Sequence, residues 1–581
     1  MKLPLLFSMI FSISGLYAQL YIAPSEKSDS YVYVKDRVLF VQDEVHLIEN
    51  KKDKLTPNIY LRKGSQLLQG DKDSSENKGS GKLSVYQTGT SNAYDYNYWS
   101  IPVFVNGGRL DDYIYEPQSN LISKRSNLIS GLDGQSTPLN ISNRWIYTFS
   151  GNNYSNWLFA GDNFDLLPGE GFSMKGVNGN NPNLIDDKPI NSGSSQTYDF
   201  RGIPGNGLIE LPIKKEQVLL VGNPYPSALD LNKFLIENTA TTGIAYFWDS
   251  RENGNSHYLA DYEGGYGTYS PGTGVYVPPV FKKYSDGSET GTTGKYYERK
   301  ISPIAQGFMI MGRTEGMISF KNSHRLYQKQ ETDISVFKSS ENNMSLNLII
   351  EIDSTYIQKL ALVFRPDAST EEDHAMDARK MNINPKDISW GIGNQPFVVN
   401  VRPKISEELI PLKVSIDQAS ELKFSISDLQ NFDPARVFIY DSRDDLYFNI
   451  KTGYLKMHLE MGEYTDRFFF SFIENQPEET TKPVIGSPSE SIDKPENILL
   501  NSIEIFQNNF HQQLEVKMLY DSEISSLRLY DLNGKIIYAE NFRLKNKEFN
   551  LPTANLSNAV YIVKVNTTDN KELTKKIGVK N

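Results

Sequence analysis

Short runs of alternating apolar and polar residues make up nearly the whole chain, and this pattern limits the fold to β-sheets. In residues 346–352, LNLIIEI, every second residue is a large aliphatic one, which is the period of a half-buried strand. Gly, Asn, Asp, Ser and Pro separate such runs and favour turns. The 34 Tyr residues also suit strands. The sequence therefore predicts an all-β protein with a multi-domain β-sandwich architecture.

Helical signals are confined to two short segments. The first is Ser227–Asn238, with Ser227 as a candidate N-cap. The second is Ser369–Lys380, which begins with the residues STEE, a capping-box pattern. We expect a short helix at each place.

Shifts in composition predict five segments. A Pro-, Ser-, Thr- and Glu-rich stretch has too little apolar mass to pack and is typical of a disordered linker between folded regions. The segments are a signal peptide (1–18), an N-terminal β-rich region (19–330), a β-sandwich (331–472), the linker (473–497) and a small C-terminal β domain (498–581).

The N-terminal region contains two series of similar motifs, which suggests a diverged duplication. Each series contains a predicted strand followed by a Pro turn, and then a long connecting segment. After it come a strand that begins with Gly-Phe and a strand that follows a Gly. One series lies at 96–103, 171–176 and 205–213, and the other at 219–226, 307–312 and 315–322.

The first residues are typical of a secretory signal peptide. Lys2 precedes an apolar run that is short for a membrane span, and cleavage is expected between Ala18 and Gln19. No later stretch is long and apolar enough to cross a bilayer as a helix. We therefore expect a protein without a transmembrane segment after processing.

Composition excludes several classes of function. The chain has no Cys, so disulfides, thiolate nucleophiles and Cys-ligated metals are excluded. The formal net charge is −11 and no basic block stands out in the body, which argues against nucleic acid as a partner.

The C-terminal segment carries a second export signal. Leu527 and Leu529 precede Asn533-Gly534, a dipeptide suited to a two-residue hairpin turn. The segments YDLNGK, LSNAVYIVKV and TKKIGVK resemble the C-terminal sorting domain of the type IX secretion system of Gram-negative bacteria. The matching sorting-signal residues are Tyr530, Asp531, Gly534, Lys535, Tyr561, Lys575 and Lys576.

This resemblance implies an Ig-like β-sandwich that an outer-membrane exporter recognises. It implies that the type IX translocon is a partner and that the protein travels through the periplasm to the outer-membrane surface or the medium. The chain differs from the family at two points. IFQNNF at Ile505–Phe510 replaces the usual YPNP-like turn, and Ala559-Val560 stands where a Gly usually precedes the tyrosine.

The body is similar to large uncharacterised surface or secreted proteins that carry the same sorting domain. The similarity covers roughly residues 60–470 and implies no established activity, so it assigns no catalytic residue. The segments that carry it are SQLLQG (65–70), GKLSVYQTGT (81–90), YNYWSIPV (96–103), VGNPYPSALD (221–230), YFWD (246–249), NSHYLADYEGGYG (255–267), SPIAQGFMI (302–310) and FKNSHR (320–325).

No catalytic signature is present. The chain lacks HExxH, GxSxG and GxxxxGK[ST] motifs, and its six His residues form no i, i+4 pair. Two acidic loops offer oxygen ligands for calcium, although neither fits the EF-hand pattern. One contains Asp249, Glu252, Asn253 and Asn255, and the other is Asp441–Asp445. Solvated polar turns are the favoured interpretation, so no cofactor or metal is predicted and calcium is left open.

These observations favour a non-enzymatic, exported protein with an adhesive or a glycan- or protein-binding role. An exported hydrolase that acts on polysaccharide or peptide is the alternative, and a structural component of the surface layer is a third. The arrangement of Trp99, Trp248, Asp249 and Glu263 in space should show whether the N-terminal region has a site.

Overall fold

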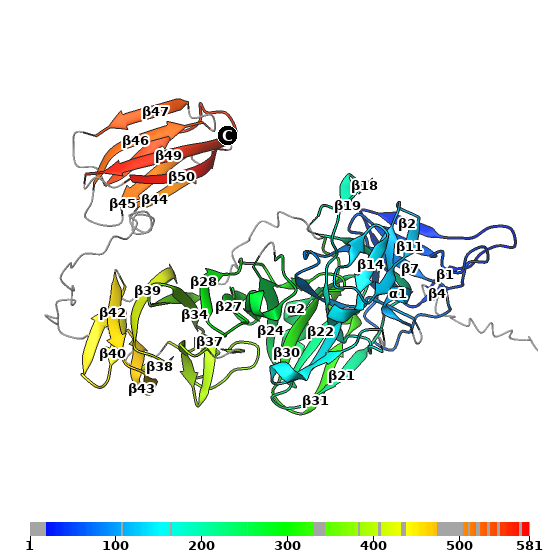
Figure 1. Cartoon of the computed structure of the whole chain (residues 1–581), viewed down its shortest axis with the longest axis horizontal. Coiled ribbons are helices and arrows are strands. Elements are labelled where there is room, and N and C mark those ends of the chain that lie inside the picture. Colours follow the sequence, from blue (N-terminus) through cyan, green and yellow to red (C-terminus); the bar gives the residue numbers. More distant parts are fainter. Residues whose placement is uncertain are drawn as a thin grey trace, which may run out of the picture. The chain divides into compact units, whose positions relative to one another are not determined.

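A computed structural model of the chain confirms the all-β prediction (Figure 1). It divides into two compact units, Met1–Pro483 and Val484–Asn581. The predicted signal peptide and linker lie outside the residues that the structure describes. Those residues are 19–105, 108–162, 165–193, 195–251, 254–329, 343–381, 384–404, 408–431, 437–451, 453–472, 503–508, 512–518, 523–531, 535–542, 547–568 and 572–579.

The first described strands form coils of a three-sided parallel β-helix. Leu20 pairs with Val45 on one side. Val32 pairs with Ile59, and Ile59 with Leu83, on the second side. Val38 pairs with Gln66 on the third side. The strands are β1 (Leu20–Ile22), β2 (Val32–Lys35), β3 (Val38–Val41), β4 (Val45–Leu47), β5 (Ile59–Arg62), β6 (Gln66–Gln69) and β7 (Leu83–Thr88).

An eleven-stranded, largely antiparallel sheet forms the centre of the N-terminal region, in the order β28-β27-β25-β24-β30-β22-β15-β17-β8, with β16 and β26 at its side. Bridges between Trp99 and Gln306 and between Glu170 and Val221 bring β8 and β17 back toward β30 and β22. The sheet therefore nearly closes into a barrel. Its strands are β8 (Tyr96–Ser100), β15 (Tyr147–Gly151), β16 (Trp157–Phe159), β17 (Gly171–Lys175), β22 (Val218–Gly222), β24 (Thr241–Ser250), β25 (Glu263–Ser270), β26 (Val275–Val277), β27 (Val280–Lys283), β28 (Glu289–Thr293) and β30 (Gly307–Gly312).

Smaller sheets surround this centre. The two motif series pair in the same way within themselves, because β8 pairs with β17 in one and β22 with β30 in the other. The last strands of the two series, β21 and β31, pair with each other. The remaining strands are β9 (Val103–Phe104), β10 (Ile114–Pro117), β11 (Ser123–Arg125), β12 (Asn127–Ile129), β13 (Gln135–Ser136), β14 (Leu139–Ser142), β18 (Asn181–Ile185), β19 (Lys188–Asn191), β20 (Thr197–Pro204), β21 (Ile209–Ile213), β23 (Ala228–Asp230), β29 (Ile301–Ser302), β31 (Gly316–Phe320) and β32 (Arg325–Leu326).

Helices are short and few among the described residues, which contain α1 (Leu110–Tyr113) and α2 (Leu231–Glu237). The helix expected from Ser227 begins at Leu231 instead. Asp230 is its N-cap and accepts the Lys233 N–H at 3.0 Å. Ser227 cannot cap it because its buried hydroxyl accepts the Arg325 guanidinium at 3.1 Å.

The helix expected at Ser369–Lys380 is absent, and side-chain chemistry explains the error. The Asp373 carboxylate accepts the Ser369 N–H at 2.5 Å, and the Asp377 carboxylate accepts the Asp373 N–H at 2.7 Å. These bonds hold the segment as turns, since Asp side chains compete with helical hydrogen bonds. Ala375 has a positive φ of 61°, which a right-handed helix does not allow.

The strands from Met344 to Ser471 form one continuous curled sheet, in the order β41-β40-β43-β38-β36-β37-β34-β33-β39-β42 with β35 beside β37. Its core contains the fully buried Trp390 and Phe397, and it continues into Leu220 and Tyr246 of the N-terminal region. The strands are β33 (Met344–Ile352), β34 (Tyr356–Phe364), β35 (Ala378–Arg379), β36 (Asp387–Ile392), β37 (Gln395–Arg402), β38 (Ile410–Ile416), β39 (Ser420–Gln430), β40 (Phe438–Asp441), β41 (Leu446–Asn449), β42 (Tyr454–Leu459) and β43 (Gly462–Ser471).

The C-terminal unit is a sandwich of two antiparallel sheets, drawn in orange and red in Figure 1. Leu514 and Val516 of one sheet share a core with Leu527, Leu529 and Val563 of the other. The predicted alternation thus places the expected side chains inside. The sheets are β44 (Ile503–Asn508), β45 (Gln513–Met518) and β48 (Glu548–Pro552), and β47 (Ile536–Asn541), β46 (Ile524–Tyr530), β49 (Ala559–Thr567) and β50 (Glu572–Val579).

A buried polar network around Arg325 joins three of the motif segments. Its guanidinium donates to the Leu67 carbonyl at 2.6 Å, to Asn206 Oδ1 at 3.0 Å and to Asn322 Oδ1 at 3.1 Å. Tyr225 offers its ring face at 4.9 Å. Burial lowers the pKa of Arg325 to about 10. The motifs SQLLQG, VGNPYPSALD and FKNSHR therefore meet in the interior, where they support the fold.

Candidate functional site

A pocket beside the central sheet has a volume of about 410 Å³ and a polar lining. It lies between the turn before β8 and the segment that links β24 to β25. Its lining residues are Asp95, Arg251, Gly254, Asn255, Ser256, Asp261, Tyr262 and Glu263. We call it the Asp95 pocket.

Hydrogen bonds between two distant segments build this pocket. Asn92 Nδ2 donates to the Gly254 carbonyl at 3.0 Å, and the Tyr262 hydroxyl donates to the Tyr94 carbonyl at 2.7 Å. A Cβ on Gly254 would lie 2.6 Å from Asp95 Oδ1. Glycine at 254 therefore allows the loop backbone to approach the Asp95 carboxyl closely, and a side chain there would displace that carboxyl.

The charges in the Asp95 pocket are mostly negative. Burial raises the pKa of Asp95, which accepts the Gly254 N–H and the Ser250 hydroxyl. Arg251 forms a 3.2 Å ion pair with Glu263, and the Ser256 hydroxyl donates to Asp261 at 2.5 Å. The lining thus offers three carboxyl groups and one guanidinium.

A buried lysine lies against the same wall. The Lys175 amine sits 3.8 Å from the centre of the Trp145 ring and 4.9 Å from that of Tyr262. It contacts His257 Nδ1 at 3.0 Å, and His257 Nε2 contacts Asp133 at 2.6 Å. An ammonium at Lys175 is a donor only, so Nδ1 of His257 accepts and Nε2–H donates to Asp133.

The Lys175 side chain supports the pocket wall, since the residue is only 3% exposed. Burial lowers its pKa to about 7, against the attraction of Asp95 and Asp133. The surrounding rings favour the charged form as well.

Replacement of Lys175 by Met should stabilise the protein more at pH 6 than at pH 9. Below pH 7 the buried lysine is charged in both the folded and the unfolded chain, so its burial cost is fully present. Between pH 7 and 10.5 only the unfolded chain keeps the proton, so wild-type stability rises with pH through this group. Thermal unfolding at both pH values measures the difference.

Lys188→Met is the matched control, because Lys188 is exposed. It should shift the melting temperature little and equally at both pH values. A pH-independent difference between Lys175→Met and wild type would contradict the assignment of a charged buried lysine.

The four residues expected to report on a site do not converge. Trp99 is buried against Tyr198, with ring centres 5.5 Å apart. Trp248 packs against Tyr266. Asp249 and Trp248 are neighbours on β24 and so project to opposite faces of the sheet. Of the four, Glu263 alone lines the Asp95 pocket.

The structure describes every residue of one candidate calcium loop, Asp441–Asp445, but only part of the other. The Asp441 carboxylate accepts two bonds from Arg467, at 2.8 and 2.7 Å, and Asp444 pairs with Arg443. In the other loop Glu252 and Asn253 lie outside the described residues. Within the described part of the chain, no group of three or more His, Asp or Glu side chains is arranged to hold a metal ion.

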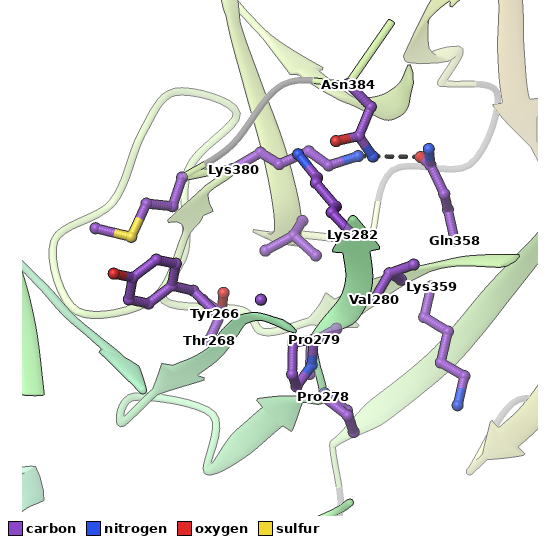
Figure 2. Close-up of a pocket in the computed structure, with 14 residues that line it drawn as sticks. Tyr266, Thr268, Pro278, Pro279, Val280, Lys282, Gln358, Lys359, Lys380 and Asn384 are labelled. Atoms are coloured by element: carbon purple, nitrogen blue, oxygen red, sulfur yellow. Dashed lines mark hydrogen bonds between the residues drawn. The ribbon is translucent and has the colours of Figure 1, made fainter. Parts of the chain in front are cut away.

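A second cavity lies where β25 and β27 meet β34 and β37 (Figure 2). Its volume is about 70 Å³, which suits water molecules better than a sugar ring. Figure 2 shows Lys380 directed toward Gln358, which accepts it at 3.0 Å. Lys380 also pairs with Asp387 at 2.6 Å. The cavity is therefore a small gap between packed sheets.

Residues of the predicted sorting signal lie at the end of β46, on β49 and on β50, which are neighbouring strands of the C-terminal unit. In register, Tyr530 lies beside Ile562, and Ile562 beside Lys576. The Asp531 carboxylate accepts the Lys535 N–H at 2.9 Å. Gly534, which lies between these two residues in the sequence, is outside the described residues.

The other two described sorting-signal residues make contacts within the unit. The Tyr561 ring is buried and its hydroxyl donates to the Ser557 carbonyl at 3.0 Å. Lys575 Nζ donates to the Ile505 carbonyl of the other sheet at 2.8 Å. Gln19, on the expected cleavage bond, is exposed, while Ala18 is outside the described residues.

No helix in the described part of the chain is both long enough and apolar enough to span a bilayer. No curated protein matches the sequence. A solved structure titled "Biofilm associated protein - BSP domain" aligns over 86% of this chain and 96% of that chain, with 8% identity and a TM-score of 0.13. A TM-score of 0.13 does not indicate a shared fold.

Two family models match the chain, and both describe domains of unknown function. One, DUF8694, covers residues 492–579, which include the C-terminal unit's described strands. The other, DUF8693, covers residues 28–472, from the β-helix to the end of the curled sheet, and because that is most of the chain, the protein belongs to the DUF8693 family.

Proposed function

We propose that the protein is exported to the cell surface or the medium and binds a neutral glycan in the Asp95 pocket. The pocket itself carries this proposal. Its volume of about 410 Å³ and its few convergent polar groups are typical of a small-ligand site. Adhesion to a surface glycan would follow from such binding.

The lining favours a ligand rich in hydroxyl groups. Carboxylates at Asp261 and Glu263 accept hydroxyl protons, while Arg251 and the Asn255 amide donate to hydroxyl oxygens. Three carboxyl groups against one guanidinium would repel an anionic polysaccharide. A neutral sugar is rich in hydroxyl groups and carries no negative charge, so it suits this lining on both counts.

The export route is part of the same proposal. The type IX translocon is the proposed partner, with passage through the periplasm of a Gram-negative bacterium. Support comes from the resemblance of the C-terminal motifs and from their position on adjacent strands of a separate compact unit. The signal peptide predicted at 1–18 would supply the first step.

Replacement of Arg251 by Ala should weaken glycan binding at least about tenfold, because a charged hydrogen bond to the ligand contributes roughly 1.5–3 kcal/mol. A glycan array identifies the ligand, and calorimetry measures its affinity. Arg443→Ala is the matched control, since Arg443 is 65% exposed and paired with an acid, as Arg251 is at 70%. Absence of neutral glycans among the hits, or equal affinity in both variants, would refute the proposal.

A polysaccharide hydrolase is the second candidate, and the raised pKa of Asp95 favours it. A carboxyl group with a raised pKa is better suited to act as a general acid than one with an ordinary pKa. In that case, incubation with the bound glycan would release new reducing ends, and Asp95→Asn would abolish the release while it preserved binding. Binding without release would leave the protein non-enzymatic.

A further inference from the structure

The first coil of the β-helix leaves one end of the solenoid open. In the described part of the chain, β1, β2 and β3 each pair along one edge only, with β4, β5 and β6 of the second coil. The Val32 N–H points to the Asn58 carbonyl of that coil. Because backbone groups alternate along a strand, the N–H and C=O of Tyr33 point to the open side.

The apolar core is open at the same end. In the second coil, Val45, Ile59 and Leu67 have no exposed surface. Among the inward side chains of the first coil, Ile22 and Val41 are buried, while Leu20, Val32, Val34 and Leu39 are only partly buried. At the rim, Tyr21 is 60% exposed and Phe40 57%. Solenoids usually end in a polar cap, which this coil does not form.

The three open strands also lack the charges that normally protect sheet edges. Lys35 is the only charged residue in β1, β2 and β3, and it is held in an ion pair with Asp186. A row of unpaired backbone groups without charged residues readily accepts another strand.

We propose that this end binds the same end of a second copy of the chain and forms a two-fold symmetric dimer. A single strand from another protein would cover one of the three edges, whereas another three-sided coil covers all three and the core. A two-fold axis across the junction pairs the strands antiparallel, so donors on each copy meet acceptors on the other.

Charge supports a second copy as the partner. The chain as a whole carries −11, which would repel an identical molecule. Residues 20–41 instead carry three acidic and three basic residues, so the facing coils are neutral. Oppositely charged groups can therefore meet across the two-fold axis.

Sedimentation of the chain from Gln19 to Asn581 tests the dimer. The wild-type chain should sediment at twice the monomer mass. Tyr33→Pro should weaken the dimer at least about tenfold, because proline removes an N–H that points to the open edge and leaves the bonds to the second coil intact. Tyr33→Thr keeps that N–H and introduces a β-branched side chain that suits a strand, so it should remain dimeric.

A second variant guards against misfolding of the first. Tyr21→Pro alters the open edge of β1 in the same way, and circular dichroism shows whether each variant keeps its fold. A monomeric wild-type chain would overturn the proposal. So would a dimer that persists in a folded proline variant, because the contact would then lie elsewhere.

Discussion

A chain that lacks residues 498–581 should accumulate in the periplasm, with almost none at the cell surface or in the medium. The three segments of the predicted sorting signal all lie within residues 530–580, so the deletion removes the whole proposed address. The rest of the protein should stay folded, because the C-terminal unit has a hydrophobic core of its own. Immunoblots of periplasmic, surface and medium fractions measure the change.

A reporter fusion sharpens this test from the opposite direction. A periplasmic reporter fused to residues 498–581 should reach the surface or the medium, while the same reporter without them should not. Melting curves of the truncated chain check that its body is folded. Secretion unchanged by the deletion would show that the C-terminal unit is not the export signal.

Replacement of Arg325 by Ala should cost at least about 1–3 kcal/mol of stability, the range for leaving a buried hydrogen-bond acceptor without its partner. The change leaves the Leu67 carbonyl and the side-chain oxygens of Asn206 and Asn322 without this donor in the interior. It also opens a cavity over the Tyr225 ring. Chemical denaturation and thermal melting of the body measure the loss.

The exposed Arg443 again supplies the comparison. Arg443→Ala removes a surface ion pair with Asp444, which contributes about 0–1 kcal/mol. Equal unfolding midpoints for the two variants would contradict a structural role for the Arg325 network.

Local pattern was sufficient to predict much of this fold. The alternation around Leu527, Leu529 and Val563 indicated the correct buried face, since a strand places every second side chain on one side. At Ser369–Lys380, long-range packing adds to the local Asp hydrogen bonds that replace the expected helix. Ala375 adopts its left-handed conformation against Gly243, where an added Cβ would lie 2.7 Å away. No pattern within the segment itself reveals that neighbour.

The β-helix and the pocket were missed for a similar reason. Parallel pairs such as Leu20 with Val45 require a connection through two other sides, and no short motif encodes it. The acidic loop at 249–265 did attract attention, and Asp261 and Glu263 within it line the pocket. Asp95, Lys175 and Asp133 join that loop only in three dimensions.

The Arg325 network also sets the order in which the body can fold. The Arg325 guanidinium donates to the carbonyl of Leu67, which precedes it by 258 residues in the sequence. The Gln66 amide donates to the carbonyl of Gln328, 262 residues later. Contacts of such sequence separation slow folding, because a long loop must close before they form. The β-helix coils, although they emerge first from the ribosome or a translocon, therefore cannot complete their packing until residue 328 has followed. During that interval their strand edges are open to aggregation, and a chaperone that holds the emerging N-terminal region would protect it.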